Sequence, residues 1–112
     1  MPADKAEARA HEAVANGARE MDRLLEHRSR LGACVLLLRS KAINFSRLKE
    51  LLDETDGNLG AHLKKLEDAG YITVNKEFES RKPVSWYTLT RKGTDAARSH
   101  LAALEELLAG AS

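Results

Sequence analysis

The sequence predicts a mainly helical α+β fold with one small β-hairpin. Aromatic residues make up only 4% of the 112 residues, so the core has to be built from Leu and Ala, which favour helices. Apolar residues recur at helical spacing along most of the chain, whereas residues 72–90 alternate with the period of two that strands require. A chain of 112 residues holds one modest hydrophobic core and is too short for a second independent one.

Residues 1–19 form an Ala-rich segment that ends at Asn16-Gly17, a pair typical of a helix C-cap. Alanines bury little surface, so this segment is either a solvated extension or a helix that packs in a dimer. We expect an N-terminal helical extension over residues 1–19, a main domain with its C-terminal helix over residues 20–108, and a tail over residues 109–112.

Three helices are predicted after this extension and before the middle of the chain. The first breaks around residues 27–29, where Ser29 is a candidate N-cap for the second. The second helix is apolar on almost every side and should be the most buried element. A very short strand is expected at residues 42–44, and Ser46 then caps the third helix, with Asn44 as the alternative cap.

The fourth predicted helix, residues 55–69, has one narrow apolar stripe. Leu59, Leu63 and Leu66 lie at positions i, i+4 and i+7, so they face the same side. Thr55 can cap the helix, and Gly70 can end it as a left-handed C-cap. The opposite side carries small or polar residues, with His62 on the flank: Gly57, Asn58, Ala61, Lys64, Lys65 and Asp68. Such a helix is anchored by one face and presents the other.

The strand period follows this helix. Ile72, Val74 and Phe78 alternate with polar residues before the loop at residues 79–83, and a second strand follows it. Thr90 can cap a last helix whose leucine stripe is too apolar for an isolated, exposed helix. The order of elements is that of a winged helix-turn-helix, with N- and C-terminal helices available for dimerisation.

The charge is distributed unevenly. Although the net charge of the whole chain is only +1, residues 39–92 hold eleven Lys and Arg against eight Asp and Glu, which leaves +3. Residues 93–112 carry one basic and three acidic residues, which leaves −2. A surface for a polyanion therefore belongs in the middle of the chain.

The run T-D-G-N-L-G-A-H-L-K-K-L-E-D-A-G-Y-I, followed by a basic hairpin and W-Y-T-L-T-R-K-G, resembles the short winged-helix transcriptional regulators of the MarR and ArsR groups. The resemblance covers about residues 20–108. It implies a homodimeric DNA-binding repressor or activator that is paired through its terminal helices. The chain departs from many ArsR-type relatives at Gly60 and Ala61, where they have Ser and Arg, and its single Cys34 cannot supply the cysteine-rich site of metal sensors.

Several side chains suit double-stranded DNA. Lys64 and Lys65 can pair with phosphates, Asn58 with adenine, and Asp56 can accept a hydrogen bond from cytosine. The lysines can equally form a solvated face, and Asp56 can simply complement the helix dipole. The full set of candidate DNA-binding residues is Ser46, Arg47, Thr55, Asp56, Gly57, Asn58, Ala61, His62, Lys64, Lys65, Arg81 and Lys82.

The hairpin and the third helix contribute the remaining candidates. Arg81 and Lys82 at the loop can enter the minor groove or hold its phosphates, or they can serve only to keep the loop soluble. Ser46 and Arg47 begin the third helix, where free N–H groups attract phosphate, although capping alone also accounts for Ser46.

Catalysis and metal binding find no support in the sequence. The four histidines are scattered without ligand spacing, no nucleophile can be paired with a base, and no cofactor motif is present. No segment has the length and hydropathy of a membrane span or signal peptide, so we expect a cytoplasmic protein.

We therefore expect a sequence-specific regulator of transcription that binds double-stranded DNA, with repression as the favoured mode. In this hypothesis the helix over residues 55–69 enters the major groove and the wing over residues 79–83 flanks it. The alternative is a winged-helix protein-interaction module without DNA binding. A small-molecule effector bound between the terminal helices and the core is compatible with the first hypothesis.

Overall fold

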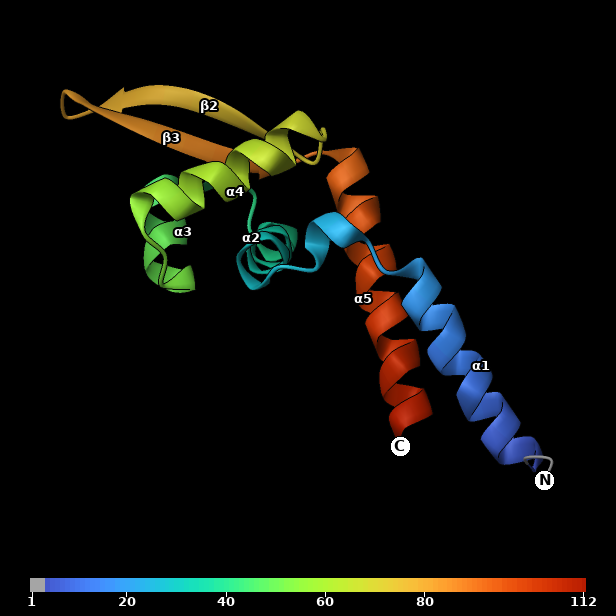
Figure 1. Ribbon diagram of the computed structural model, residues 1–112. Helices are drawn as coiled ribbons and strands as arrows, with labels where there is room; N and C mark the ends of the chain where they lie inside the picture. The colour runs from blue at the N-terminus through green and yellow to red at the C-terminus, as the bar shows by residue number, and fades with distance from the viewer. Residues whose placement is uncertain (1–3) are drawn as a thin grey trace.

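The structure is a computed structural model that describes residues 4–112 (Figure 1). The elements follow in the order α1 (Lys5–Glu20), a short 3₁₀ helix η1 (Arg23–Leu25), α2 (Arg28–Arg39), β1 (Ile43–Asn44), α3 (Phe45–Leu52), α4 (Asp56–Asp68), β2 (Ile72–Glu79), β3 (Lys82–Leu89) and α5 (Arg91–Ala111). The predicted fold class, mainly helical with a small β-hairpin, is confirmed. No helix within residues 4–112 combines the length and the apolar character that crossing a membrane requires.

The molecule is elongated, with principal extents of 69 × 26 × 21 Å. Figure 1 shows why: α1 and α5 run side by side away from the winged-helix lobe, and the β2–β3 hairpin points in the opposite direction. We call the α1–α5 pair the arm. The winged-helix lobe, from α2 to β3, holds nearly all of the buried leucines.

Leucines from three helices, α2, α3 and α4, form the core of this lobe. Leu59, Leu63 and Leu66 of α4 are at most 2% exposed, which confirms that the predicted stripe anchors this helix. They lie with Leu48 of α3 and with Ala33, Cys34 and Leu37 of α2 in one cluster. Burial of each leucine stabilises the fold by roughly 1.5–3 kcal/mol relative to an exposed one. Because the three leucines lie on the same face of α4, the helix is fixed from one side only.

The sheet has three antiparallel strands in the order β1-β3-β2. Ile43 pairs with Tyr87, and the hairpin register runs from Ile72 opposite Leu89 to Glu79 opposite Lys82. The hairpin turn is tighter than the predicted loop at residues 79–83, because Glu79 and Lys82 belong to the strands. Ser80 and Arg81 form a two-residue turn in which both φ angles are positive, at 49° and 66°.

Two predicted N-caps and one C-cap are confirmed. The Thr55 hydroxyl accepts a hydrogen bond from the Asn58 N–H at 3.2 Å, and the Thr90 hydroxyl accepts one from the Gly93 N–H at 2.9 Å. Gly70 follows α4 with φ of +80°, in the left-handed region that favours glycine. The start and the end of α4 therefore follow directly from the sequence.

Two other caps differ from the preferred prediction. Asn44, the alternative to Ser46, caps α3 by accepting a hydrogen bond from the Arg47 N–H at 2.8 Å. His27 caps α2 in place of Ser29, because its Nδ1 accepts a hydrogen bond from the Ser29 N–H at 3.1 Å. Ser29 is instead buried inside the first turn, where its hydroxyl bonds to a carboxylate from a distant turn.

The expected helix end at Asn16-Gly17 is wrong, since α1 continues to Glu20. Gly17 is buried against α5, and a Cβ added there would lie 2.6 Å from the Ala103 carbonyl oxygen. Gly110 of α5 has the same role against α1, because its Cβ would lie 2.4 Å from Cγ2 of Val14. Both glycines allow close helix packing. Residues 5–19 of the expected extension and residues 109–111 of the expected tail belong to the two helices of the arm, whereas residues 1–3 lie outside the described part of the chain.

Candidate nucleic-acid interface

The solvent side of α4 is nearly bare. Gly57, Asn58 and Ala61 are exposed opposite the buried leucines, and a Cβ added at Gly57 or Gly60 would meet no atom within 4 Å. Packing within the chain therefore does not require either glycine, although each costs roughly 1 kcal/mol of helix propensity relative to Ala. This face leaves the helix backbone open to a close partner.

The two lysines of this face differ. Lys64 pairs with Asp68 one turn later, Nζ to Oδ1 at 2.8 Å, and this hydrogen bond is the main cause that raises the pKa of Lys64. Lys65 is also exposed and forms no ion pair within residues 4–112. Because Lys64 already has a partner, Lys65 is the cation of α4 that is available to a phosphate.

The last turn of α3 and the first turn of α4 are linked by charge. Nζ of Lys49 lies 2.8 Å from Oδ1 of Asp56, so the acidic first turn of α4 is tied to α3. Arg47 pairs with Glu50 on the surface of α3, and Ser46 is exposed beside it. Thr55 is occupied as the cap of α4, so its hydroxyl already has a partner within the chain.

The hairpin tip carries Arg81 and Lys82, both exposed and without an ion pair among the described residues. Phe78 lies next to them and is 79% exposed, although its alternation with Ile72 and Val74 suggests a core position. The reason is visible in Figure 1: the hairpin extends past α3, so no helix covers its tip. Sequence analysis missed Phe78, and the only signal was an aromatic residue one position before the loop.

The turn between α3 and α4 is held from the start of α2. Arg28 donates from Nη1 to the Leu52 carbonyl oxygen at 2.8 Å and from Nη2 to that of Asp53 at 3.3 Å. Asp53 has a φ of 51°, in the left-handed region, and the Ser29 hydroxyl donates to Glu54. These contacts join residues that are about 25 positions apart, and the sequence alone gives no sign of them.

His62 does not share the exposed face of α4. Its side chain is 16% exposed and points toward α2, where Nδ1 lies 2.9 Å from Nη1 of Arg30. Its ring stacks on that of His27 with centroids 3.9 Å apart. The structure thus brings together the other α4 candidates and separates His62 from them.

Neither a metal site nor a reactive thiol is found in the part of the chain that the structure describes. No group of three or more His, Cys, Asp or Glu side chains within residues 4–112 could hold a metal ion. Cys34 is buried in the core, and burial, with a smaller contribution from Asp22, raises its pKa to about 12. It is therefore a thiol that packs as a small apolar side chain.

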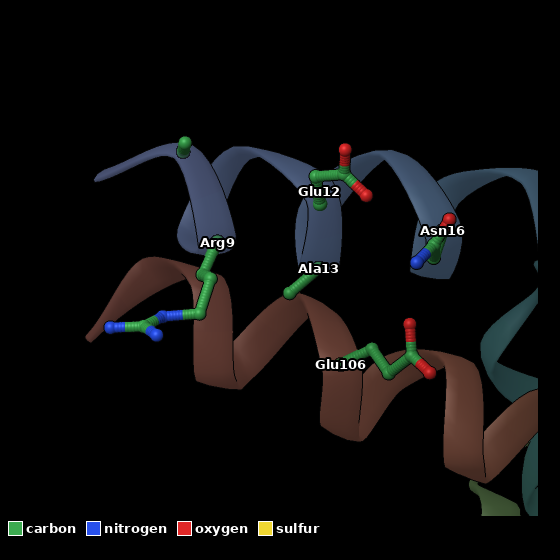
Figure 2. Close-up of a pocket in the computed structure, with 6 residues that line it drawn as sticks. Arg9, Glu12, Ala13, Asn16 and Glu106 are labelled. Atoms are coloured by element: carbon green, nitrogen blue, oxygen red, sulfur yellow. The ribbon is translucent and has the colours of Figure 1, made fainter. Parts of the chain in front are cut away.

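A shallow groove lies along the arm (Figure 2). Figure 2 shows Ala13 of α1 directed toward α5, with Glu12 and Asn16 along α1 and Glu106 on α5. Two large apolar side chains of the arm are also exposed, Val14 at 39% and Leu108 at 68%. The arm therefore presents apolar surface that residues 4–112 do not cover.

The family model described as a winged helix DNA-binding domain matches residues 29–108. The chain belongs to this family. The match runs from the first turn of α2 to α5, so it includes the α3–α4 unit, the hairpin and most of one arm helix. Membership of this winged-helix family supports a DNA-binding regulator.

Solved structures of transcriptional regulators are similar to this chain. The chain is 35% identical over 72 residues to the uncharacterized protein MJ0432 of Methanocaldococcus jannaschii, covering 64% of this chain and 78% of that protein. The structure of a transcriptional regulator homologue from Pyrococcus horikoshii OT3 superposes with a TM-score of 0.78 at 28% identity, covering 90% of this chain and 98% of the other. The MarR crystal structure gives a TM-score of 0.69 at 20% identity, covering 91% of this chain and 72% of MarR, so the fold is MarR-like.

Proposed function

We propose that this winged-helix protein binds double-stranded DNA in a sequence-specific manner and regulates transcription, with repression as the favoured mode. The observation that carries the proposal is the bare outer face of α4, which is fixed by three buried leucines and has two glycines that internal packing does not require. A helix anchored in this way can enter the major groove, where its backbone comes close to the bases and the phosphates.

The contacts within this interface follow from the free groups. Asn58 is exposed and suits a bidentate contact with adenine, while Lys65 suits a phosphate. Oδ1 of Asp56 is already paired with Lys49, which leaves Oδ2 to accept from cytosine, so we rank Asp56 below Asn58. The proposed contacts on α3 and α4 also include Ser46, Arg47, Thr55, Gly57, Ala61 and Lys64. His62 is left out because it faces α2.

The wing contributes a second contact. Arg81 and Lys82 at the hairpin tip are exposed and form no ion pair within residues 4–112, and Phe78, opposite Pro83, adds an exposed aromatic ring near the tip. Cations that follow the minor groove, together with an apolar side chain at its wall, are a common way to flank a major-groove helix. The wing over residues 79–83 therefore lies on the flanking minor groove or backbone in our proposal.

We propose a homodimer formed through the arm. The exposed Val14 and Leu108, with Ala8 and Ala13 of the groove, supply apolar surface for a second copy. Most symmetric regulators place two recognition helices one helical turn of DNA apart. The terminal segments, residues 1–19 and 109–112, then act in dimerisation. An unidentified small-molecule effector is a further candidate partner, since the structurally similar BpsR of Bordetella bronchiseptica is regulated in DNA binding by 6-hydroxynicotinic acid.

Selection of bound duplexes from a random pool tests this proposal. We expect one enriched sequence made of two half-sites about 10 base pairs apart, which would report specificity and dimer geometry together. Affinity for that duplex should fall steeply as salt rises, because phosphate contacts release counterions. A pool without enrichment, or an affinity that salt does not change, contradicts the proposal.

One observation favours a protein-interaction module as the second candidate. Lys64 and Lys49 are neutralised by Asp68 and Asp56, so the positive charge near the exposed face is small. A dimer with no measurable affinity for random duplex DNA at low salt would support this candidate, because non-specific binding is the first consequence of a DNA-binding surface.

A further inference from the structure

A cluster of titratable side chains joins the inner flank of α4 to the start of α2. It consists of His27, Arg30, Glu54 and His62, and we call it the histidine cluster. The His62 ring stacks on His27 at 3.9 Å, its Nδ1 lies 2.9 Å from Nη1 of Arg30, and its Nε2 lies 3.9 Å from Oε2 of Glu54. The side chains of His62 and Glu54 are only 16% and 9% exposed, so water screens these contacts weakly.

The hydrogen bonds require both imidazoles to be neutral. A guanidinium can only donate, so Nδ1 of His62 accepts from Arg30 and its proton is on Nε2, which faces Glu54. Nδ1 of His27 accepts the Ser29 N–H as the cap of α2. An imidazolium carries protons on both nitrogens and can accept neither bond. Protonation therefore removes the contact between His62 and Arg30 and weakens the start of α2.

The surrounding charges also oppose protonation. Arg30 of α2 and Lys65 of α4 add positive charge beside His62, Arg28 lies 3.8 Å from Glu54, and Glu54 is the one carboxylate that faces the His62 ring. Burial lowers the pKa of His62 below its ordinary value, and His27 and Arg30 lower it further, while Glu54 acts in the opposite direction.

The lowered pKa of His62 determines how the stability of the folded protein depends on pH. In the unfolded chain His62 titrates near its ordinary pKa of about 6.5, whereas in the folded chain it takes up a proton only at lower pH. The unfolded state thus binds more protons between the two pKa values, so the stabilisation is complete above about pH 6.5 and is lost as the pH falls through this window. Glu54 stays ionised there, because its pKa is held below the ordinary range, mainly by the Ser29 hydroxyl.

We propose that the histidine cluster is a proton-sensitive contact that holds α4 in its DNA-binding position, so that acidification releases specifically bound DNA. His62 acts as a positioning residue in this scheme and does not touch DNA. The inference rests on the proposed DNA binding of α4. It also makes a distinctive prediction, because additional positive charge on the flank of α4 would on its own strengthen binding to a polyanion.

The test compares the wild type with His62→Gln. Glutamine can still accept a hydrogen bond from Arg30 but does not titrate between pH 5 and 8. We expect the wild type to lose affinity for the selected duplex from about pH 7.5 to about pH 5.5, by up to about tenfold per pH unit for each linked proton, and His62→Gln to lose much less. His11→Gln removes an exposed histidine that pairs with Glu7 on α1 and is the matched control. The ratio of its affinities at the two pH values should follow the wild type, whatever its effect on the dimer.

Thermal unfolding of the free protein over the same pH range separates the two proposals. The wild-type midpoint should fall as the pH falls below about 6.5, and His62→Gln should reduce that fall. If no duplex binds at about pH 7.5 while the midpoints behave in this way, the proposed function fails and the pH-sensitive contact stands.

A second variant, His27→Asn, keeps a capping oxygen and removes the stacked ring, so it should also reduce the pH dependence. It replaces His62→Gln if that protein does not fold. The inference is overturned if these variants keep the wild-type pH dependence of both affinity and unfolding, or if acidification strengthens wild-type binding to the selected duplex.

Discussion

The arm and the outer face of α4 use glycine in opposite ways. In the arm, Gly17 and Gly110 are where a side chain would collide with the partner helix, at 2.6 Å and 2.4 Å from the nearest atoms. On α4, a Cβ added at Gly57 or Gly60 would meet nothing within 4 Å among residues 4–112 beyond the chain neighbours and the backbone of the helix itself. The first pair is explained by packing within the chain, whereas the second pair is not. The contrast supports our proposal that the α4 face binds a partner outside the chain.

Filling the arm contact should give the largest change in stability. Gly17→Leu places a good helix former against α5, so any loss comes from overpacking and not from helix propensity. We expect the free energy of unfolding to fall by about 1–3 kcal/mol, measured by urea denaturation. Ala15→Leu, at an exposed position of the same helix, is the control and should change it by less than about 0.5 kcal/mol. Equal effects of the two variants would remove the distinction between the two kinds of glycine.

Adding a methyl group to the α4 face should separate stability from binding. Gly57→Ala meets no atom of the chain, so we expect the free protein to gain up to about 1 kcal/mol from helix propensity. The same methyl group occupies the approach to DNA, so affinity for the selected duplex should fall by about tenfold, as seen in a binding titration. A variant that gains stability and keeps full affinity would show that DNA does not approach this face closely.

The smallest expected effects distinguish the two lysines. Lys65→Ala should lower the slope of log affinity against log salt by about 1, because Lys65 has no partner in the chain. Lys64→Ala should lower it by less, because Asp68 already pairs with Lys64 at 2.8 Å. Asp68→Asn, which frees Lys64, should raise affinity at low salt. The assignment of the two lysines is wrong if Lys64→Ala has the larger effect.

Local patterns were sufficient to predict the order of the elements, the leucine stripe of α4, the Thr55 and Thr90 caps and the left-handed Gly70. Each of these depends on residues within about one helical turn of one another, where spacing determines geometry.

The features that the sequence did not predict depend on residues that are far apart in the sequence. Gly17 resembles a helix end until Ala103 is known to lie against it, and His62 resembles a surface residue until His27 and Arg30 are placed beneath it. Phe78 continues the apolar alternation of β2, but its exposure depends on where the helices stop relative to the hairpin tip. These contacts follow from tertiary packing, which local periodicity does not encode.

The central claim, that the outer face of α4 meets DNA, is tested most directly by protection of a single thiol. In Ala61→Cys the new thiol lies on the exposed face, and the native Cys34 is buried with its pKa raised to about 12, so a maleimide should label only position 61. Ala102→Cys, exposed on the arm, is the control. We expect saturating selected duplex to slow labelling at position 61 by about tenfold or more and to leave position 102 unchanged. Equal labelling of position 61 with and without bound duplex would contradict the claim.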